Sequence, residues 1–320
     1  MPDVGHISFV GAEESGSWVR TLTRKKREAI RELHRIKPIW NLVPLLFLAI
    51  WAAAGALIVT FPSWAIRLPA YVAIGVVIHG FGNLMHEGIH GNLFRRRSLD
   101  RWFGFLFGAP VFFSCTAYRV THLLHHWYNR TERDPDEFTN LKLPHPVLSV
   151  AFYVWIVIGM LLYLLHVPLT ALTRGTPRER GQVIMEYTLL GVSYSALFLS
   201  AVSYGFLGTV VHCWIVPLAF AAVIGNVRGW AEHMLTIPGH PLTQTRTVTS
   251  SRIFSFLNIN LNYHLEHHLF PGTPWYNLPK LHVLLQDEYR DAGSFIYKSY
   301  LKFLWDAFRA GVHGLAPSRR

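Results

Sequence analysis

The stretch NYHLEHHLFP occupies residues 262–271 and holds three histidines within five positions. The same H-x-x-H-H pattern occurs at residues 122–126 as HLLHH, and a related cluster, HEGIH, occupies residues 86–90. Residues three and four apart share one face of a helix, so each cluster can direct two or three imidazoles to one point. These clusters contain eight of the 18 histidines of the chain: His86, His90, His122, His125, His126, His264, His267 and His268.

This histidine pattern predicts a metal centre. Imidazole binds Fe, Zn, Cu or Ni, and eight such ligands are too many for one ion. They fit two ions that keep positions open for another reactant. His233, which ends the segment RGWAEH at residues 228–233, is a candidate ninth ligand. Ligating histidines usually donate their other ring N–H to an acceptor, and the candidate acceptors are Glu87, Asp134, Asp136, Glu232 and Glu266. We interpret the remaining histidines, His282 among them, as structural.

Composition indicates an integral membrane protein. Hydrophobic residues make up 51% of the chain and charged residues only 15%. The apolar runs at residues 40–60, 64–85, 184–203 and 206–227 are each about 20 residues long, which matches the hydrocarbon thickness of a bilayer. We therefore expect four transmembrane helices. Residues 103–115 are apolar but too short to cross alone.

A fifth apolar run, at residues 147–172, requires a separate interpretation. If it crossed the membrane as well, the third histidine cluster would lie on the opposite face from the second. Gly159, His166 and Pro168 interrupt the run, so we expect an interfacial or re-entrant hairpin here. The result is an all-α protein with four spanning helices and a cytoplasmic helical cap that holds the histidines.

Charge sets the expected orientation and partners. The net charge is +11, and a basic stretch between Arg20 and Lys37 precedes the first apolar run, which is typical of a cytoplasmic, lipid-facing anchor rather than a nucleic-acid site. Arginines at residues 95–97, 101, 174, 178 and 180 favour the same side. The expected domains are a basic N-terminal segment at 1–38, a membrane domain at 39–285 and an interfacial segment at 286–320, with both termini and the active site cytoplasmic.

Three other classes of metal protein are compatible with part of this histidine pattern. HEGIH also matches the H-E-x-x-H pattern of zinc proteases, but a protease would leave both H-x-x-H-H clusters unused. A soluble di-iron carboxylate bundle needs paired Glu-x-x-His motifs, and only Glu87 with His90 fits. A metal transporter places its ligands near the middle of spanning segments, whereas these clusters lie at or beyond the segment ends.

At these residues the chain resembles the membrane fatty-acid desaturase superfamily, which includes carotenoid hydroxylases and ketolases. The likeness covers about residues 40–285. His86 and His90, then His122, His125 and His126, and then His264, His267 and His268 stand in the order and spacing of that superfamily's three histidine boxes.

The resemblance implies two iron ions at the cytoplasmic ends of four spanning helices, with His233 as the best match to an additional ligand. It implies that O₂ is the co-substrate and that a lipid acyl chain receives a double bond. Electrons are expected from a separate donor similar to a ferredoxin. The alternative activity is hydroxylation or ketolation of a carotenoid or other terpenoid by the same centre.

Overall fold

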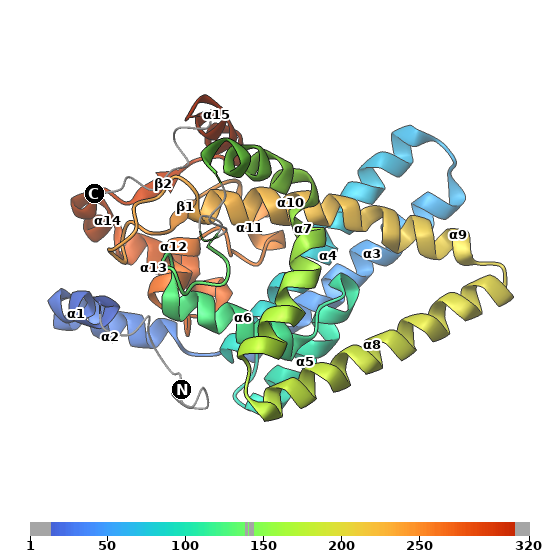
Figure 1. Ribbon diagram of the computed structural model, residues 1–320, viewed down its shortest axis with the longest axis horizontal. Coiled ribbons are helices and arrows are strands. Elements are labelled where there is room, and N and C mark those ends of the chain that lie inside the picture. Colours follow the sequence, from blue (N-terminus) through green and yellow to red (C-terminus); the bar gives the residue numbers. More distant parts are fainter. Residues whose placement is uncertain (1–13, 138–139, 141–143, 311–320) are drawn as a thin grey trace. The chain divides into compact units, whose positions relative to one another are not determined.

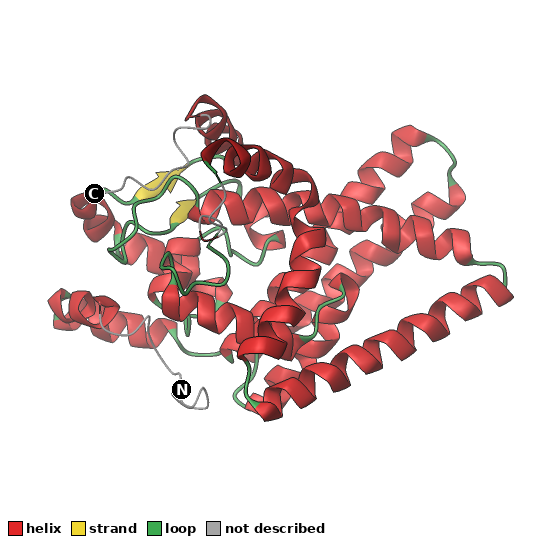
Figure 2. Ribbon diagram, in the orientation of Figure 1, coloured by secondary structure: helices red, strands yellow, loops and turns green. Residues whose placement is uncertain are grey.

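The protein is described by a computed structural model that covers residues 14–137, 140 and 144–310 (Figure 1). Helices dominate it, as expected, and two short strands accompany them (Figure 2). The expectation of an all-α protein is wrong in this detail, because β1 (Arg246–Val248) pairs in parallel with β2 (Phe295–Tyr297). Strands of three residues are too short to show the alternation that marks a strand in a sequence.

The helices follow one another with few long connections. In chain order they are α1 Glu14–Thr21, α2 Arg24–Leu33, η2 Pro38–Leu42, α3 Val43–Thr60, α4 Trp64–His90, α5 Arg97–Gly108, η3 Ala109–Val111, α6 Cys115–Tyr128, α7 His145–Arg174, α8 Pro177–Ser203, α9 Leu207–Val210, η5 Val211–Ile215, α10 Val216–His233, α11 Arg252–Leu257, α12 His264–Leu269, η6 Trp275–Asn277, α13 Leu278–Leu284, α14 Gln286–Ala292 and α15 Tyr300–Ala310.

The chain divides into two compact units. Unit 1 comprises residues 1–36, 121–156 and 227–320, and unit 2 comprises residues 37–120 and 157–226. Three of the four divisions fall inside α6, α7 and α10, so each of these helices contributes to both units, and the fourth lies between α2 and η2. The predicted divisions near residues 38 and 285 stay predictions.

Five helical segments of the described chain are long and apolar enough to cross a membrane: Arg24–Thr60, Trp64–His90, Tyr153–Arg174, Pro177–Ser203 and Leu207–His233. Three of them contain predicted spans, and Leu207–His233 begins one residue after the start of the fourth predicted span, 206–227. The predicted hairpin at residues 147–172 is wrong, because α7 is one helix of 30 residues with Pro168 inside it. A long apolar helix can keep an internal proline where neighbouring groups satisfy the backbone that it frees. The helices at 97–111 and 115–128 meet at a bend of 97°.

Unit 2 is built around the α3–α4 pair. The segment Phe61-Pro62-Ser63 joins these helices, and the buried side chains of Ile58, Tyr71 and Ile74 contribute to their common core. Near the end of α4, Gly88 lies so close to α5 that a Cβ would come within 2.9 Å of the Asp100 carbonyl oxygen. Glycine is therefore required in the middle of the HEGIH cluster. Gly91 then ends α4 in the left-handed region, at φ 75°.

Unit 1 has two hydrophobic clusters. In one, Leu22 and Ile30 of the N-terminal segment pack with Leu265, Phe270 and Leu281. Apolar side chains of the basic N-terminal segment therefore contact the segment that carries the third histidine cluster. In the other, Trp230 and Ala231 of α10 pack with Val248 of β1 and with Phe303 and Ala307 of α15. The two clusters support the segments that carry the histidines.

Candidate metal centre

The α6 helix carries the second histidine cluster, and its first turn is held from within unit 2. The Glu186 carboxylate accepts hydrogen bonds from the Ser114 hydroxyl at 2.6 Å, from the Thr116 backbone N–H at 2.9 Å and from the Thr116 hydroxyl. One turn later, Arg119 donates to Glu179 at 3.1 Å. A carboxylate at a helix N-terminus satisfies free N–H groups and complements the helix dipole. These contacts therefore fix the start of the helix that carries His122, His125 and His126.

The end of α10, where His233 lies, is held by Arg246. This side chain is fully buried and its guanidinium donates to the carbonyl oxygens of Ala231, of Met234 at 2.8 Å and of Leu235 at 3.1 Å. Its carbon Cζ also lies 4.8–5.5 Å from the ring centroids of three aromatic side chains: Phe295, Tyr297 and Phe303. A cation suits the negative end of the helix dipole, and the aromatic faces compensate part of its desolvation.

The α12 helix is held through Glu266, the residue between His264 and His267. The Glu266 carboxylate is fully buried and accepts hydrogen bonds from the Thr247 hydroxyl and from Nδ1 of His282 at 2.6 Å. The prediction that Glu266 accepts a bond from a ligand histidine is therefore wrong. Residue 266 projects to a different side of the helix from residues 264, 267 and 268, and there it joins α12 to β1 and α13.

Seven of the nine predicted histidines lie together in unit 1. One group consists of His125, His233 and His268, and a second combines Glu232, His233 and His264; in each group the potential ligand atoms lie within 4.8 Å of one another. Nε2 of His264 lies 2.9 Å from Nε2 of His233. The four histidines thus converge on one point from α6, α10 and α12, and His233 belongs among them.

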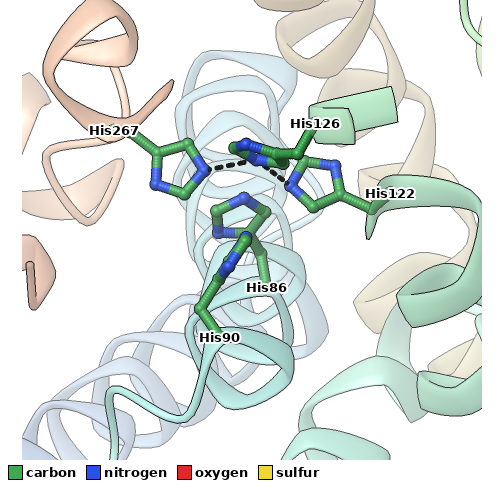
Figure 3. Close-up of side chains that lie close together, drawn as sticks. All are labelled: His86, His90, His122, His126 and His267. Atoms are coloured by element: carbon green, nitrogen blue, oxygen red, sulfur yellow. Dashed lines mark hydrogen bonds between the residues drawn. The ribbon is translucent and has the colours of Figure 1, made fainter. Parts of the chain in front are cut away.

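The other three histidines of unit 1 form a neighbouring group. Nε2 of His126 lies 2.9 Å from Nε2 of His122 and 3.0 Å from Nε2 of His267 (Figure 3). The ring of His126 also stacks on that of His268, with centroids 4.2 Å apart. The two groups are therefore adjacent, and α6 and α12 contribute to both.

His86 and His90, also drawn in Figure 3, belong to unit 2. They lie one turn apart at the end of α4, with ring centroids 4.7 Å apart. His86 is buried and His90 is partly buried. The predicted pairing of these two rings on one helix face is confirmed.

The unit 1 histidines fit transition-metal ions. Two imidazole nitrogens that bind one ion at about 2.1 Å and at right angles lie about 3.0 Å apart, which matches the N–N distances of 2.9–3.0 Å in both groups. Nε2 of His268 is buried and has no hydrogen-bond partner among the described residues. Burial lowers the pKa of His264 and of His268 well below the ordinary histidine value, so both rings are neutral at pH 7 and keep a lone pair for a metal.

Two of the predicted carboxylate acceptors contact the ring nitrogen that faces away from these groups. Asp134 accepts from Nδ1 of His125 at 2.9 Å, and Glu232 lies 3.5 Å from Nδ1 of His264. Burial raises the pKa of Asp134, but the His125 ring and the N–H groups of Arg130 and Asp136 outweigh it and keep the pKa below the ordinary value. Asp134 is therefore an ionised acceptor, and it leaves Nε2 of His125 available to a metal.

Sequence reasoning missed three further groups. Asn129 follows His125 by four residues, and its amide lies 3.4 Å from Nδ1 of His268; the i, i+4 spacing from His125 is a signal that could have found it. Arg246 and Glu186 lie far from the clusters in sequence, and no local pattern marks their contacts. His282 was expected to be structural, and its hydrogen bond to Glu266 joins α13 to α12.

Comparison with known proteins places this geometry in a class of enzymes. A sequence profile of the fatty acid desaturase family matches residues 62–300. The chain therefore belongs to the fatty acid desaturase family, and it is an oxidoreductase of lipid metabolism and a multi-pass membrane protein. The predicted family membership is confirmed.

Individual relatives are distant but match along most of the chain. Dihydrorhizobitoxine desaturase of Bradyrhizobium elkanii is 28% identical over 289 residues, which cover 82% of this chain and 80% of the relative. Sphingolipid delta(4)-desaturase DES1 of Gallus gallus is 26% identical and covers 92% of this chain and 91% of its own. Sphingolipid delta(4)-desaturase/C4-monooxygenase DES2 of Rattus norvegicus is 23% identical, with 89% and 87% covered.

Proposed function

We propose that the protein is an O₂-dependent di-iron desaturase that introduces a double bond into the hydrocarbon chain of a lipid. The single observation that carries this proposal is the convergence of seven buried or partly buried histidines in two adjacent groups. Neutral nitrogen donors leave the charge of the ions largely uncompensated, and when bound and reduced, two irons supply the activation of O₂ that removes hydrogen from an unactivated methylene.

The proposed ligand sets are unequal. His125, His233, His264 and His268 hold one iron. His122, His126 and His267 hold the other. His86 and His90, which are adjacent on α4 and match the first histidine box, stay predicted metal ligands. Asp134 keeps the ring of His125 in the orientation and tautomer that metal binding needs. Glu232 lies 3.5 Å from Nδ1 of His264.

The histidine grouping constrains the proposed membrane topology through a parity argument. His125 and His233 belong to one group in unit 1, so an even number of crossings separates them. Three segments between them qualify as spans, those of α7, α8 and α9–α10. We propose that α8 and α9–α10 cross and that α7 does not, which leaves the arginines at 174, 178 and 180 on the cytoplasmic side. With α3 and α4, this gives four crossings and cytoplasmic termini.

The electron donor is proposed to be a separate acidic protein similar to a ferredoxin. Arg95, Arg96 and Arg101 are exposed on unit 2 and would attract such a donor at long range. Their effect on membrane orientation is a second reason for the same charges.

Metal content tests the proposal most directly. Purified protein should contain two iron ions per chain and little zinc, whereas zinc without iron would favour a protease. His125→Ala and His267→Ala should each lower the iron content and abolish activity while the protein still inserts into the membrane. Normal turnover in either variant would remove the ligand assignment.

The substrate is tested by lipid and pigment profiling of cells that express the chain or its His125→Ala variant. New alkenes in acyl or sphingoid chains support the desaturase, and the chain that changes identifies the substrate class. Hydroxylation of a lipid chain is the second candidate, because the DES2 relative is named for both activities. Altered carotenoids with unchanged lipids would support the terpenoid alternative instead.

A further inference from the structure

The α15 helix leaves part of its apolar surface exposed. Phe303 and Ala307 face the core of unit 1 and are 0% and 2% exposed. On the neighbouring side, Leu301, Trp305 and Phe308 are 78%, 61% and 71% exposed, and their spacing of four and three residues makes one stripe. Lys302, Asp306 and Arg309 fall on the remaining face. Only about half of the apolar arc therefore rests on other residues that the structure describes.

A largely apolar groove of about 470 Å³ lies along this stripe. Tyr153 and Ile156 of α7 and Trp230 of α10 form one side, and Leu301, Trp305 and Phe308 contribute to the other. Tyr153 begins the apolar segment Tyr153–Arg174, and Trp230 lies in the last turn of the segment Leu207–His233. The groove is thus located at the ends of two segments suited to a bilayer.

The charges on the polar side of α15 favour a lipid partner. Lys302 pairs with Asp306 at 2.8 Å, and Lys298 and Arg309 are exposed cations nearby, so the local charge is positive. A helix with an apolar stripe that contains Trp and Phe, bordered by basic residues, is typical of the boundary between head groups and acyl chains. Basic residues at this level attract anionic lipids.

We propose that α15 is an interfacial helix whose Leu301, Trp305 and Phe308 side chains insert into the bilayer, with a lipid acyl chain in the groove beside Trp230. Lys298 and Arg309 meet the lipid head groups. The proposal concerns a surface of unit 1 and is independent of the metal chemistry. Phe303 of the same helix contacts Arg246, which holds the end of α10, so the membrane contact adjoins the support of His233.

The experiment attaches a fluorophore to single cysteines in the full chain, reconstituted in nanodiscs of phosphatidylcholine and phosphatidylglycerol. Leu301→Cys and Phe308→Cys report on the stripe, and Lys302→Cys, one residue from Leu301, is the matched control on the polar face. A Cys213→Ala background is used, and the same background without an added cysteine, treated with the fluorophore, corrects for labelling at Cys115, which is buried. Brominated lipid should quench the two stripe labels at least about twofold more than the control label, and aqueous iodide should quench them less.

Two outcomes would overturn the proposal. Equal quenching by iodide at residues 301, 302 and 308 would mean that the stripe faces water. Protection of the stripe labels from both quenchers would mean that another protein, or a second copy of this chain, covers it. Replacing phosphatidylglycerol by phosphatidylcholine should weaken the bromolipid effect, and an increase on that change would contradict the roles of Lys298 and Arg309.

Discussion

Arg246 is a buried cation whose hydrogen bonds all go to backbone carbonyls at the end of α10. Arg246 therefore acts on the backbone around His233 and not on a metal ligand directly. Because carbonyl groups at a helix end lack partners of their own, the guanidinium determines where this helix stops. It therefore supports the metal centre without touching it.

Arg246→Met should lower the free energy of unfolding by about 2–4 kcal/mol, because three carbonyl oxygens lose charged donors. The expected measurement is chemical unfolding of the purified full chain together with its iron content, which should fall. Arg246→Lys should recover part of the loss. Arg290→Met on the exposed face of α14 is the control, and equal stability of the two methionine variants would contradict this role.

Asp134→Asn keeps the shape of the side chain but removes the charge that accepts from Nδ1 of His125. Outer partners of ligating histidines typically contribute 10–100-fold to metal affinity, so we expect a loss of about that size for iron. Iron content after dialysis against a graded chelator measures it. The control is Glu132→Gln at an exposed position of the same loop, and an iron affinity equal to that of the control would show that Asp134 does not orient the ring.

The histidines could be predicted from the sequence, but only some of the residues that contact and hold them could. Cluster spacing predicted His122, His125 and His126 because residues on one helix are related by fixed geometry. Asp134 lies nine residues beyond His125 and could be proposed for the same reason. Arg246 and His282 meet their partners through tertiary packing, which no local spacing encodes.

Among the elements, α6 depends most on a distant carboxylate. At the start of α6, Ser114 and Thr116 donate three hydrogen bonds to Glu186 of α8. This contact therefore holds the start of the helix that carries the second histidine cluster, and it lies before His122, the first of these histidines.

Glu186→Ala should destabilise the protein by about 1–3 kcal/mol, because buried donors lose their acceptor at a helix N-terminus. Thermal unfolding measures this change, and Glu186→Gln should be intermediate because its amide keeps only one acceptor oxygen. Thr188→Ala on the exposed side of α8 provides the comparison. A melting temperature for Glu186→Ala that matches Thr188→Ala would argue against the contact.

Apolar length predicted four of the five described helical segments that are long and apolar enough to cross a membrane. The number of four crossings stays a prediction. The start of α4 at Trp64 agrees with the expectation, and its end extends five residues beyond it, to His90. The hairpin at residues 147–172 failed because proline and glycine do not break a helix reliably in an apolar environment. The pair β1 and β2 was missed because its partners are far apart in the chain.

For the whole molecule, the proposed topology makes a simple prediction about sidedness. Cysteines at positions 132 and 240, which precede α7 and follow α10, should react with an impermeant reagent from the cytoplasmic side. A cysteine at Tyr204, 81% exposed after α8, should react only from the opposite side. Labelling of intact cells and of inverted vesicles distinguishes these cases. Reaction of positions 132 and 240 from opposite sides would overturn the parity argument.

Metal removal should loosen unit 1 as a whole, since its proposed ligands come from α6, α10 and α12. We expect chelation of iron to lower the melting temperature of the purified protein and to increase hydrogen exchange in these three helices. The α3–α4 core of unit 2, apart from the end of α4, should exchange as before. An unchanged exchange pattern in α12 would contradict a metal that joins these elements.

The order of the histidines along the chain has a consequence for biosynthesis. Those of unit 1 run from His122 to His268, so the group of His122, His126 and His267 is complete only at residue 267, and the other group only at residue 268. Before that point, the growing polypeptide presents isolated imidazoles at the membrane surface. On the proposed ligand assignment, neither iron site can therefore be completed before all the proposed spanning segments have been synthesised.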